Sequence, residues 1–279
     1  MSQPSVIDLR EAAAASAVTV VGDLHGSLES FVSSLRLCDA YPHLLSDGSS
    51  TIVFNGDFVD RGENGVEVVA SLVLLQLAYP SQVFLLRGNH EDSFLASAYG
   101  FMDEVQAKYP HSHEGLWAAF VRFFAALPLC ALTQHAVIMH GGLPSEAFEL
   151  DDVRAISAAR RQATPTTIGA TDPVCQLMEA LLWSDPTEES GIERSTKRGG
   201  AGSLFGADVA RRWLQRHGLQ KLVRSHEVVE RGWRAMECGE GCEVITVFSS
   251  AGYPDGNGLN LGAVVVLEEV SWLAADRTE

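Results

Sequence analysis

Short apolar runs, rich in β-branched residues, recur along the chain, and each of them ends in a small cluster of polar residues. The five clearest runs cover residues 17–21, 51–54, 82–86, 136–139 and 221–223. Runs of this length and composition are typical of buried strands. Between the first three runs, apolar residues recur at helical spacing along residues 28–35 and 66–77. This alternation of strand and helix predicts an α/β core with parallel strands.

The rest of the chain predicts further helices and then further strands. Helical patterns cover residues 116–127, 151–161, 173–182 and 208–217, and Gly218 is placed to end the last of them. Residues 244–249 and 262–268 are strongly β in character and predict a mixed or second sheet on the C-terminal side. Because no internal repeat or long linker is present, we expect residues 1–279 to form a single domain, with residues 1–16 as a short N-terminal extension.

The composition is that of an ordinary soluble globular protein, with 46% hydrophobic and 20% charged residues. No apolar run is long enough to span a bilayer, so no membrane partner is expected. The alanine run at residues 12–15 follows Asp8, Arg10 and Glu11 rather than a basic segment, which argues against a signal peptide.

The five cysteines are an odd number, and three of them are scattered, which suits free thiols in a reducing compartment. We therefore expect a cytoplasmic protein, with the nucleus as a second location. The remaining two, Cys238 and Cys242, enclose Gly-Glu-Gly. Two thiols without a second pair nearby are a weak metal signal, so we interpret this segment as a glycine-rich turn between strands.

The net charge of −16 argues against nucleic acid as a partner, because no basic stretch could follow a phosphate backbone. It also means that a phosphate ester would be repelled at long range. Any site for a phosphate must therefore reverse the field locally.

The polar clusters that follow the five predicted strands contain potential metal ligands. At the carboxyl ends of strands in an open α/β sheet, such side chains would converge on one edge. They are Asp23, His25, Asp57, Asn89, His90, His140 and His226. Taken singly, each has a simpler interpretation, such as Asp23 as a helix cap or Asn89 in a left-handed turn.

Repetition at one topological place changes this interpretation and predicts a metal site. Carboxylate, imidazole and amide donors together suit Mn, Fe or Zn better than Ca or Mg. Four of the nine histidines lie in these clusters, and we expect the other five to be structural: His43, His111, His113, His135 and His217. Two cations about 3.5–4 Å apart could clamp a phosphoryl group and convert a shared water into hydroxide, which makes phosphoester hydrolysis the predicted chemistry.

At this point the motifs resemble the PPP family of metal-dependent serine/threonine protein phosphatases. The resemblance runs from about residue 18 to 268 and rests on an ordered set of segments: 22–26, 56–62, 88–91, 140–143, 181–186, 197–199, 224–227 and 247–249. Within the family it is greatest to the catalytic domain of protein phosphatase type five, on residues 99–101, 104–109, 150–154 and 224–228. The resemblance implies a central β-sandwich flanked by α-helices.

The resemblance also implies roles for individual residues. Asp23, His25 and a bridging Asp57 would hold one metal, and Asp57, Asn89, His140 and His226 would hold the other. His90 would be the general acid, oriented by Asp60, while Arg61 and Arg198 would bind the phosphate and Tyr253 would close the site. Two divalent or trivalent metal ions are implied, with Mn expected in the isolated protein and Fe or Zn as alternatives. Phosphoproteins are the implied substrates, and a regulatory subunit is an expected partner.

Five of the matching residues have structural interpretations of their own. Trp183 follows two leucines and is expected in the core, and Asp185-Pro186 is typical of a turn. Arg198 lies in a basic segment, and such a segment is most simply interpreted as a solvated loop. Arg224 precedes a predicted ligand, but pairing with a structural carboxylate would explain it equally well.

The chain departs from the family pattern at Ser250-Ala251-Gly252, where the family usually has Ala-Pro-Asn. Losing a proline and gaining a glycine predicts a looser loop, as does the glycine-rich stretch at residues 254–258. We expect this change to affect substrate preference and the response to toxin inhibitors that contact the loop.

Two other functions remain open from the sequence. A nucleotide phosphohydrolase of the diadenosine tetraphosphatase kind would share the metals, but such enzymes usually carry Asp where Glu91 stands. A catalytically inactive phosphatase-like binding module would lack a ligand or the acid, and none is missing here.

Overall fold

The computed structural model describes residues 4–10, 17–38, 50–163, 171–254, 259–267 and 272–276. His43, the alanine run at 12–15 and the stretch 255–258 lie outside these ranges. The described helices are α1 (Leu28–Leu37), α2 (Gly65–Ala78), α3 (Ser93–Ala98), α4 (Phe101–Lys108), α5 (His113–Ala126), α6 (Leu150–Arg154), α7 (Ala158–Ala163), α8 (Pro173–Trp183) and α9 (Ala207–Arg216).

The described strands form three sheets. They are β1 (Val6–Asp8), β2 (Ala17–Val21), β3 (Ser50–Phe54), β4 (Val83–Leu85), β5 (Cys130–Leu132), β6 (Ala136–Met139), β7 (Asp185–Thr187), β8 (Ile192–Arg194), β9 (Ser203–Gly206), β10 (Lys221–Arg224), β11 (Trp233–Gly239), β12 (Cys242–Val247), β13 (Ala263–Leu267) and β14 (Trp272–Asp276).

The two larger sheets each carry a parallel core. In the five-stranded sheet, of order β14-β13-β2-β3-β4, the strands β2, β3 and β4 are parallel and β13 is antiparallel to β2. In the six-stranded sheet, of order β1-β5-β6-β10-β12-β11, the strands β6, β10 and β12 are parallel. The predicted parallel α/β core is confirmed, but its strands are divided between two sheets.

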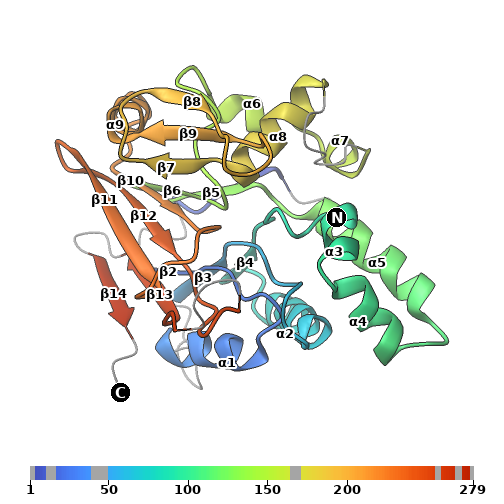
Figure 1. Cartoon of the computed structure of the whole chain (residues 1–279). Coiled ribbons are helices and arrows are strands. Elements are labelled where there is room, and N and C mark those ends of the chain that lie inside the picture. Colours follow the sequence, from blue (N-terminus) through green and yellow to red (C-terminus); the bar gives the residue numbers. More distant parts are fainter. Residues whose placement is uncertain are drawn as a thin grey trace.

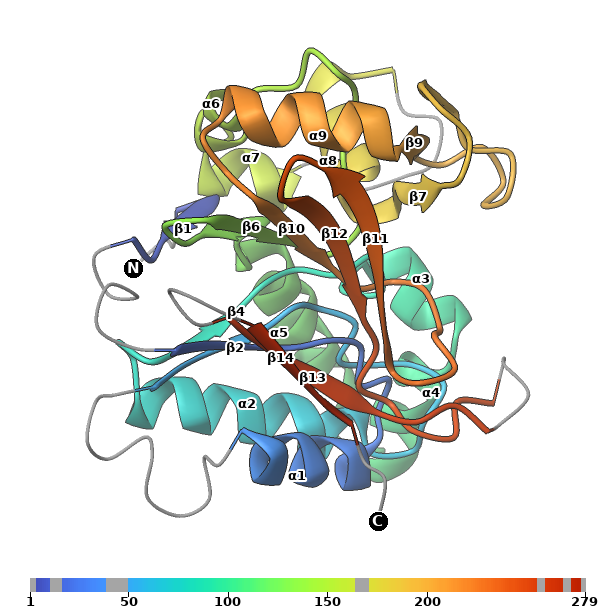
Figure 2. The same ribbon diagram turned by 90° about the vertical axis from the view of Figure 1, so that its left-hand side faces the viewer.

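The two sheets pack face to face, with helices on both outer sides (Figures 1 and 2). Alternate side chains point into the space between them, where Val20 and Val53 of one sheet join Ile138 and Val223 of the other in one buried cluster. The intervening side chains, such as Val21, pack outward against α1 and α2. Because both faces of these strands are buried, their sequences are continuous apolar runs rather than alternating ones. The predicted β-sandwich flanked by helices is confirmed.

On the outer side of the six-stranded sheet, α8 and α9 cover the strands. Trp213 of α9 is fully buried, stacks on Phe148 with 5.5 Å between the ring centroids, and donates from its indole nitrogen to the carbonyl of that residue at 2.7 Å. The N-terminus of α8 is capped by Asp172, whose side chain accepts from Val174 and Cys175, with Pro173 in the first turn.

Several local predictions differ from the structure. The helix predicted at 151–161 is two helices, α6 and α7, because Ile156 turns into the core and Ser157 starts the second helix by accepting from the backbone of Arg160 at 3.1 Å. The predicted turn at Asp185-Pro186 is strand β7, paired with β9. The predicted extension, residues 1–16, includes β1, which pairs with β5 at the edge of the six-stranded sheet.

The glycine-rich segment between the two nearby cysteines is the predicted turn: it joins β11 to β12, and Glu240 and Gly241 both adopt positive φ. All five cysteines are buried, and none of them forms a disulfide. Among the described residues, none of the helices combines the length and apolarity needed to cross a membrane.

Candidate metal centre

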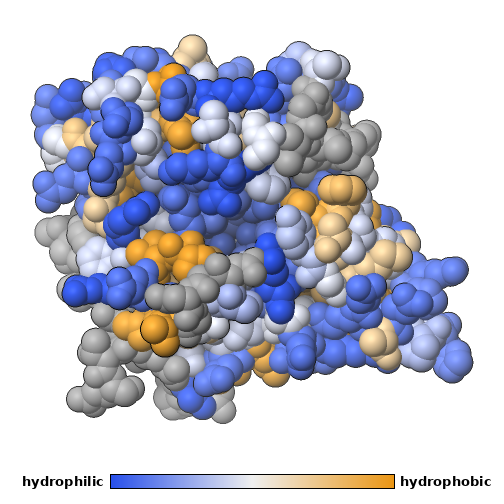
Figure 3. All heavy atoms as spheres, in the orientation of Figure 1, coloured by the Kyte–Doolittle hydropathy of each residue, from blue (hydrophilic) through white to orange (hydrophobic). Residues whose placement is uncertain are grey.

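The polar clusters that follow β2, β3, β4, β6 and β10 meet at one place, where the carboxyl ends of the two sheets come together. They line a pocket of about 250 Å³. The space-filling view shows it as a hydrophilic hollow (Figure 3). The convergence predicted for a single open sheet is thus achieved by two sheets. Its lining residues are His25, Asp57, Arg61, Asn89, His90, Tyr99, Trp183, Arg198, His226, Val228, Phe248 and Tyr253.

The backbone at this place is strained. Six non-glycine residues in the described part of the chain have positive φ, and five of them are His25, Asp57, Asp60, Arg61 and His226. Such conformations cost about 1–3 kcal/mol each and persist where the surrounding structure imposes them, which is typical of functional sites.

Two glycines let the loops after β3 and β4 touch. A Cβ atom on Gly88 would lie 2.2 Å from Oδ1 of Asp57, and one on Gly56 would lie 2.3 Å from the nitrogen of Gly88. Glu91 then ties the loops together, because its carboxylate accepts from the backbone nitrogens of Asp57, Phe58 and Gly88 at 2.7–2.8 Å.

The first group of donors surrounds His25. Its Nε2 lies 3.6 Å from Oδ2 of Asp23 and 3.6 Å from Oδ2 of Asp57. Its Nδ1 lies 3.1 Å from the carbonyl of Val59, which can only accept, so in the neutral ring Nδ1 carries the proton and Nε2 a lone pair. Three electron-rich atoms therefore face one another.

The second group repeats this arrangement around His140. Its Nδ1 lies 2.8 Å from the carbonyl of Asn55, while its Nε2 lies 2.9 Å from Oδ1 of Asn89 and 3.3 Å from Oδ2 of Asp57. His226 adds a ring 5.1 Å from that of His140. Oδ2 of Asp57 is thus shared by the two groups.

These donors fit a pair of cations, since lone pairs that face one another at this range need a positive charge between them. Oδ2 of Asp23 and Nε2 of His226 are buried and have no hydrogen-bond partner among the described residues. Without a metal, a proton takes that place: burial alone would lower the pKa of His140, but Asp57 and Asp23 outweigh it and raise the pKa to about 9.

The other pKa shifts also suit metal binding. Burial alone would raise the pKa of Asp57, but the nearby rings of His140, His90 and His25 hold it well below its usual value, so the carboxylate is charged. Burial, together with Arg198 and His140, holds the pKa of His226 well below its usual value, so this ring is neutral and able to donate a lone pair.

His90 also lies near this cluster, with its ring 4.9 Å from that of His25, and proximity alone would group it with His25 and Asp57 as a ligand. However, Nδ1 of His90 lies 2.6 Å from Oδ2 of Asp60, whose Oδ1 accepts from the backbone of Phe101 at 3.0 Å. This pair orients the ring and leaves Nε2 for a group in the pocket, which suits an acid better than a ligand.

Two arginines reach the pocket. The guanidinium of Arg61 lies 4.2 Å from the ring centroid of Tyr99, a cation–π contact. Arg198 is partly exposed and donates from Nε to Asp185 at 2.7 Å. It is therefore held in place, whereas the simplest interpretation of the sequence was a solvated loop. Asp185 also pairs with Arg224 at 2.8 Å.

Arg224 itself is structural. Its side chain is fully buried, and it donates to Asp185, Glu227 and the carbonyls of Gly141 and Ser184. This pairing with structural carboxylates was one of the two interpretations open from the sequence.

Aromatic side chains form the rest of the wall. The ring of Tyr253 lies 4.8 Å from that of His25, and the ring of Trp183 lies 5.4 Å from that of His226. Trp183 is part of the core, as expected, but one side of it also lines the pocket.

Asn55 is a residue of the site that the sequence did not single out. Its Nδ2 donates to the carbonyl of Met139 at 3.0 Å and to Oγ of Ser225 at 2.9 Å, so it links the two sheets directly beneath the donors. Its position at the end of a predicted strand, in the cluster that contains Asp57, was the signal that could have identified it.

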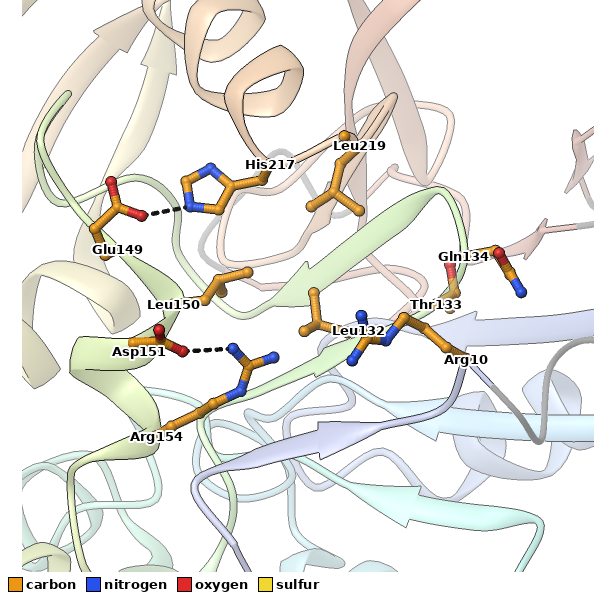
Figure 4. A pocket seen from close by; sticks show the side chains of 11 residues that line it. Arg10, Leu132, Thr133, Gln134, Glu149, Leu150, Asp151, Arg154, His217 and Leu219 are labelled. Atoms are coloured by element: carbon orange, nitrogen blue, oxygen red, sulfur yellow. Dashed lines mark hydrogen bonds and ion pairs between the residues drawn. The ribbon is translucent and has the colours of Figure 1, made fainter.

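A second pocket, of about 380 Å³, lies at the opposite end of the six-stranded sheet (Figure 4). Its two arginines are already paired, Arg10 with Asp8 at 2.8 Å and Arg154 with Asp151 at 2.7 Å, and His217 lies 2.9 Å from a carboxylate oxygen of Glu149. Because each guanidinium is neutralised locally, this pocket lacks the arrangement of facing donors that marks the metal centre.

Two packed sheets with acidic, imidazole and amide donors at their strand ends, and arginines at the rim, define a metal-dependent phosphoesterase. A family model described as calcineurin-like phosphoesterase matches residues 16–230, and the chain belongs to that family. Members of this family use a dinuclear metal centre.

Individual relatives agree. The chain is 40% identical over 258 residues to serine/threonine-protein phosphatase rdgC of Drosophila melanogaster, and the matched region covers 90% of this chain and 37% of that protein. It is 38% identical over 240 residues to human serine/threonine-protein phosphatase 5, covering 85% of this chain and 44% of that protein. The chain therefore spans less than half the length of these curated relatives.

Solved structures show the same fold. A serine/threonine phosphatase of Saccharomyces cerevisiae with similarity to human phosphatase PP5 superposes with a TM-score of 0.79 at 29% identity, covering 98% of this chain and 84% of that one. A cold-active protein-tyrosine phosphatase of a Shewanella species gives 0.68 at 19% identity, covering 98% of this chain and 80% of that one; at this identity the likeness is one of fold alone.

Proposed function

We propose that the protein hydrolyses phosphoserine and phosphothreonine monoesters in proteins. The observation that carries the proposal is that Oδ2 of Asp57 is shared by two groups of donors, 3.6 Å from Nε2 of His25 and 3.3 Å from Nε2 of His140. A shared carboxylate of this kind is what a pair of cations needs as a bridge.

Asp23, His25 and Asp57 would hold one metal, and Asp57, Asn89, His140 and His226 the other. When bound, the pair supplies Lewis acidity to the phosphoryl group and a nucleophile at neutral pH. Mn is the metal we expect in the isolated protein, with Fe or Zn as alternatives, because nitrogen and oxygen donors are mixed here.

The residues of the chain complete the reaction. Arg61 and Arg198 present planar guanidinium groups to the phosphoryl oxygens, and they counter the repulsion that a phosphate meets from a chain of net charge −16. His90 protonates the leaving alkoxide from Nε2, and Asp60 holds the ring in the orientation required. Tyr253 forms the wall beside His25.

Two features support a protein substrate rather than a dinucleotide. The named relatives with 38–40% identity are serine/threonine-protein phosphatases. Glu91 reaches three backbone nitrogens across two loops, and the shorter Asp that usually stands there in diadenosine tetraphosphatases would not span the same gap.

The test compares the turnover of a phosphothreonine peptide and of diadenosine tetraphosphate with added Mn²⁺. We expect a clear preference for the peptide. Preference for the dinucleotide would overturn the substrate assignment, and the absence of any hydrolysis by metal-loaded protein would favour the binding-module alternative.

We further propose a cytoplasmic location, with the nucleus as a second one, because all five cysteines are buried and none forms a disulfide, as in proteins of reducing compartments. Phosphoproteins are the proposed partners, together with a regulatory subunit that would direct the enzyme to them.

A further inference from the structure

The loop between β12 and β13, which carries Tyr253, is held by hydrogen bonds that its own sequence does not indicate. A looser loop is predicted from Ser250-Ala251-Gly252, and Gly252 does adopt a φ of +65°. In the described part of this loop, however, its backbone is bound by the side chain of Asn260, near the far end of the same loop, and by that of Ser30 in helix α1. The local sequence therefore says little about how firmly the loop is placed.

Asn260 makes most of these contacts. Its Nδ2 donates to the carbonyl of Ser250 at 2.7 Å, and its Oδ1 accepts from the backbone nitrogen of Tyr253 at 2.7 Å. Its own carbonyl accepts from the nitrogen of Gly252 at 2.9 Å. Because Asn260 is only 5% exposed, water cannot easily replace these bonds. The amide thus spans the loop just where a proline is missing.

A second anchor comes from helix α1. Oγ of Ser30 accepts from the backbone nitrogen of Ala251 at 3.1 Å and is itself bonded by Oγ of Ser27 at 2.9 Å. Since α1 begins shortly after His25, the loop is tied to the same segment that carries this predicted ligand.

The base of the loop is tied as well. Oγ of Ser249 accepts from the nitrogen of Gly22 at 2.8 Å and donates to the carbonyl of Ala263 at 2.7 Å. These contacts hold the two ends of the loop but do not reach Tyr253. The side chain of Asn260 does reach the backbone of that residue.

The position of Tyr253 matters because its ring lies against His25. The two centroids are 4.8 Å apart with an interplanar angle of 33°, and the ring of Phe248 lies 5.1 Å away on another side. Tyr253 is 6% exposed and lines the pocket. A shift of its backbone would therefore change the pocket wall and the packing of a predicted metal ligand together.

We propose that Asn260 is a positioning residue that fixes Tyr253 against His25 and so shapes the phosphate pocket. The inference rests on the proposed function for its kinetic readout only. The competing explanation is that packing between His25 and Phe248 holds the ring by itself.

The experiment is a double-mutant cycle with Asn260→Ala and Tyr253→Ala on the Mn²⁺-loaded protein, assayed with p-nitrophenyl phosphate. For Asn260→Ala we expect KM to rise about tenfold with kcat changed less than about twofold, the size expected when buried hydrogen bonds are lost. In the Tyr253→Ala background, Asn260→Ala should raise KM further by less than about twofold. Factors that multiply in the double variant would overturn the proposal.

Two measurements do not depend on turnover. Hydrogen exchange in the peptide 249–254 should become faster in Asn260→Ala, and calorimetry should show inorganic phosphate binding weakened by about the same factor as KM rises. Faster exchange with unchanged phosphate binding would overturn the proposal. Because both can be measured in protein without activity, a failure here is distinct from a failure of the proposed function.

Thr133→Ala is the matched control. Thr133 is also buried and accepts from a backbone nitrogen, that of Ala136 at the start of β6, at 3.0 Å, but at the far end of the six-stranded sheet. It should alter stability without altering KM. Asn260→Leu has a similar volume and no hydrogen-bonding atoms in its side chain, so it replaces the alanine variant if that one does not fold, and its KM should rise by about the same factor.

Discussion

Nε2 of His140 lies 3.3 Å from Oδ2 of Asp57, although Nδ1 of the same ring already lies 2.8 Å from the carbonyl of Asn55. A neutral ring that donates from Nδ1 offers only a lone pair to the carboxylate. The contact is therefore favourable only when a proton or a metal ion stands between the two atoms. A proton and a metal ion therefore compete for the same position.

Metal affinity should depend on pH. In the metal-free protein the pKa of His140 is raised to about 9 from 6.5, so metal must displace a proton over this range. We expect the affinity for Mn²⁺ to rise with pH between about 6.5 and 9, by about tenfold per unit for this one proton. Calorimetry in two buffers of different ionisation enthalpy measures the proton release. An affinity that stays constant between these pH values would contradict the assignment of His140.

The same pKa shift makes the stability of the metal-free protein fall, rather than rise, with increasing pH. A group whose pKa is raised on folding stabilises the protein fully below its unfolded value, here 6.5. That contribution is lost as the pH rises through about 9. Thermal unfolding after chelation should therefore show stability falling over this range, whereas the metal-loaded protein should not show this loss.

Loss of the acid should depend on the leaving group. We expect His90→Asn to lower kcat on a phosphoserine peptide by about 10²–10⁴, because the alkoxide then leaves unprotonated. The effect on p-nitrophenyl phosphate should be much smaller, since that leaving group needs no acid. Asp60→Asn should show the same pattern more weakly, because Asp60 acts through the ring. His113→Asn, on an exposed turn of α5, is the control. Equal losses on both substrates would show that the acid is elsewhere.

Arg198 should act on substrate binding and turnover without acting on the metals. We expect Arg198→Ala to lower kcat/KM about 10²-fold at saturating Mn²⁺, where the metal sites stay filled, as for the loss of one charged donor to a reacting group. Arg194→Ala removes a neighbouring exposed guanidinium that bonds only the carbonyl of Gly200 in the described structure, and it should change little. Similar losses in the two variants would point to the charge of the loop rather than to a specific contact.

One glycine substitution should abolish metal binding and activity, whereas another should stabilise the fold. Gly88→Ala places a Cβ atom 2.2 Å from Oδ1 of Asp57, which cannot be relieved without moving the carboxylate that we propose as the bridge between the metals, so metal content and activity should both be lost. Gly115 lies within α5, and a Cβ atom added there would have nothing within 4 Å. Gly115→Ala should raise stability by about 0.5–1 kcal/mol, since alanine is the better helix former. Elemental analysis and thermal unfolding measure both variants. Full metal content in Gly88→Ala would mean that the two loops are not in contact.

Much of this architecture can be read from local pattern. The strands at residues 17–21, 51–54 and 136–139 were predicted because they are buried on both faces, which makes them continuous apolar runs. Short elements such as β1, β7 and β14 were missed, because three to five residues at a sheet edge carry too little periodic signal. The helix predicted at 151–161 failed at Ile156, where a contact with a distant part of the chain overrides helix propensity.

The loop at residues 249–254 shows the same limit in a functional region. Its composition predicts a flexible loop, because glycine increases and proline restricts the range of backbone conformations. The bonds from Asn260 and Ser30 are invisible to that argument, since Ser30 is separated from Ala251 by 221 positions in the sequence.

The sequence by itself determined which residues can serve the chemistry: donors of three kinds repeat after strands, and the order of the motifs points to one family. It also determined that these donors follow buried strands, because a short continuous apolar run indicates a strand that is buried on both faces. The family resemblance already implied a β-sandwich and a bridging Asp57. Only the tertiary structure decided that the ends of strands from both sheets supply the donors, that Oδ2 of Asp57 lies 3.6 Å from His25 and 3.3 Å from His140, and that Asn55 and Asn260 hold the surroundings. The reason is physical: a side chain's hydrophobicity acts on its own position, whereas a distance between two side chains depends on how every segment between them packs.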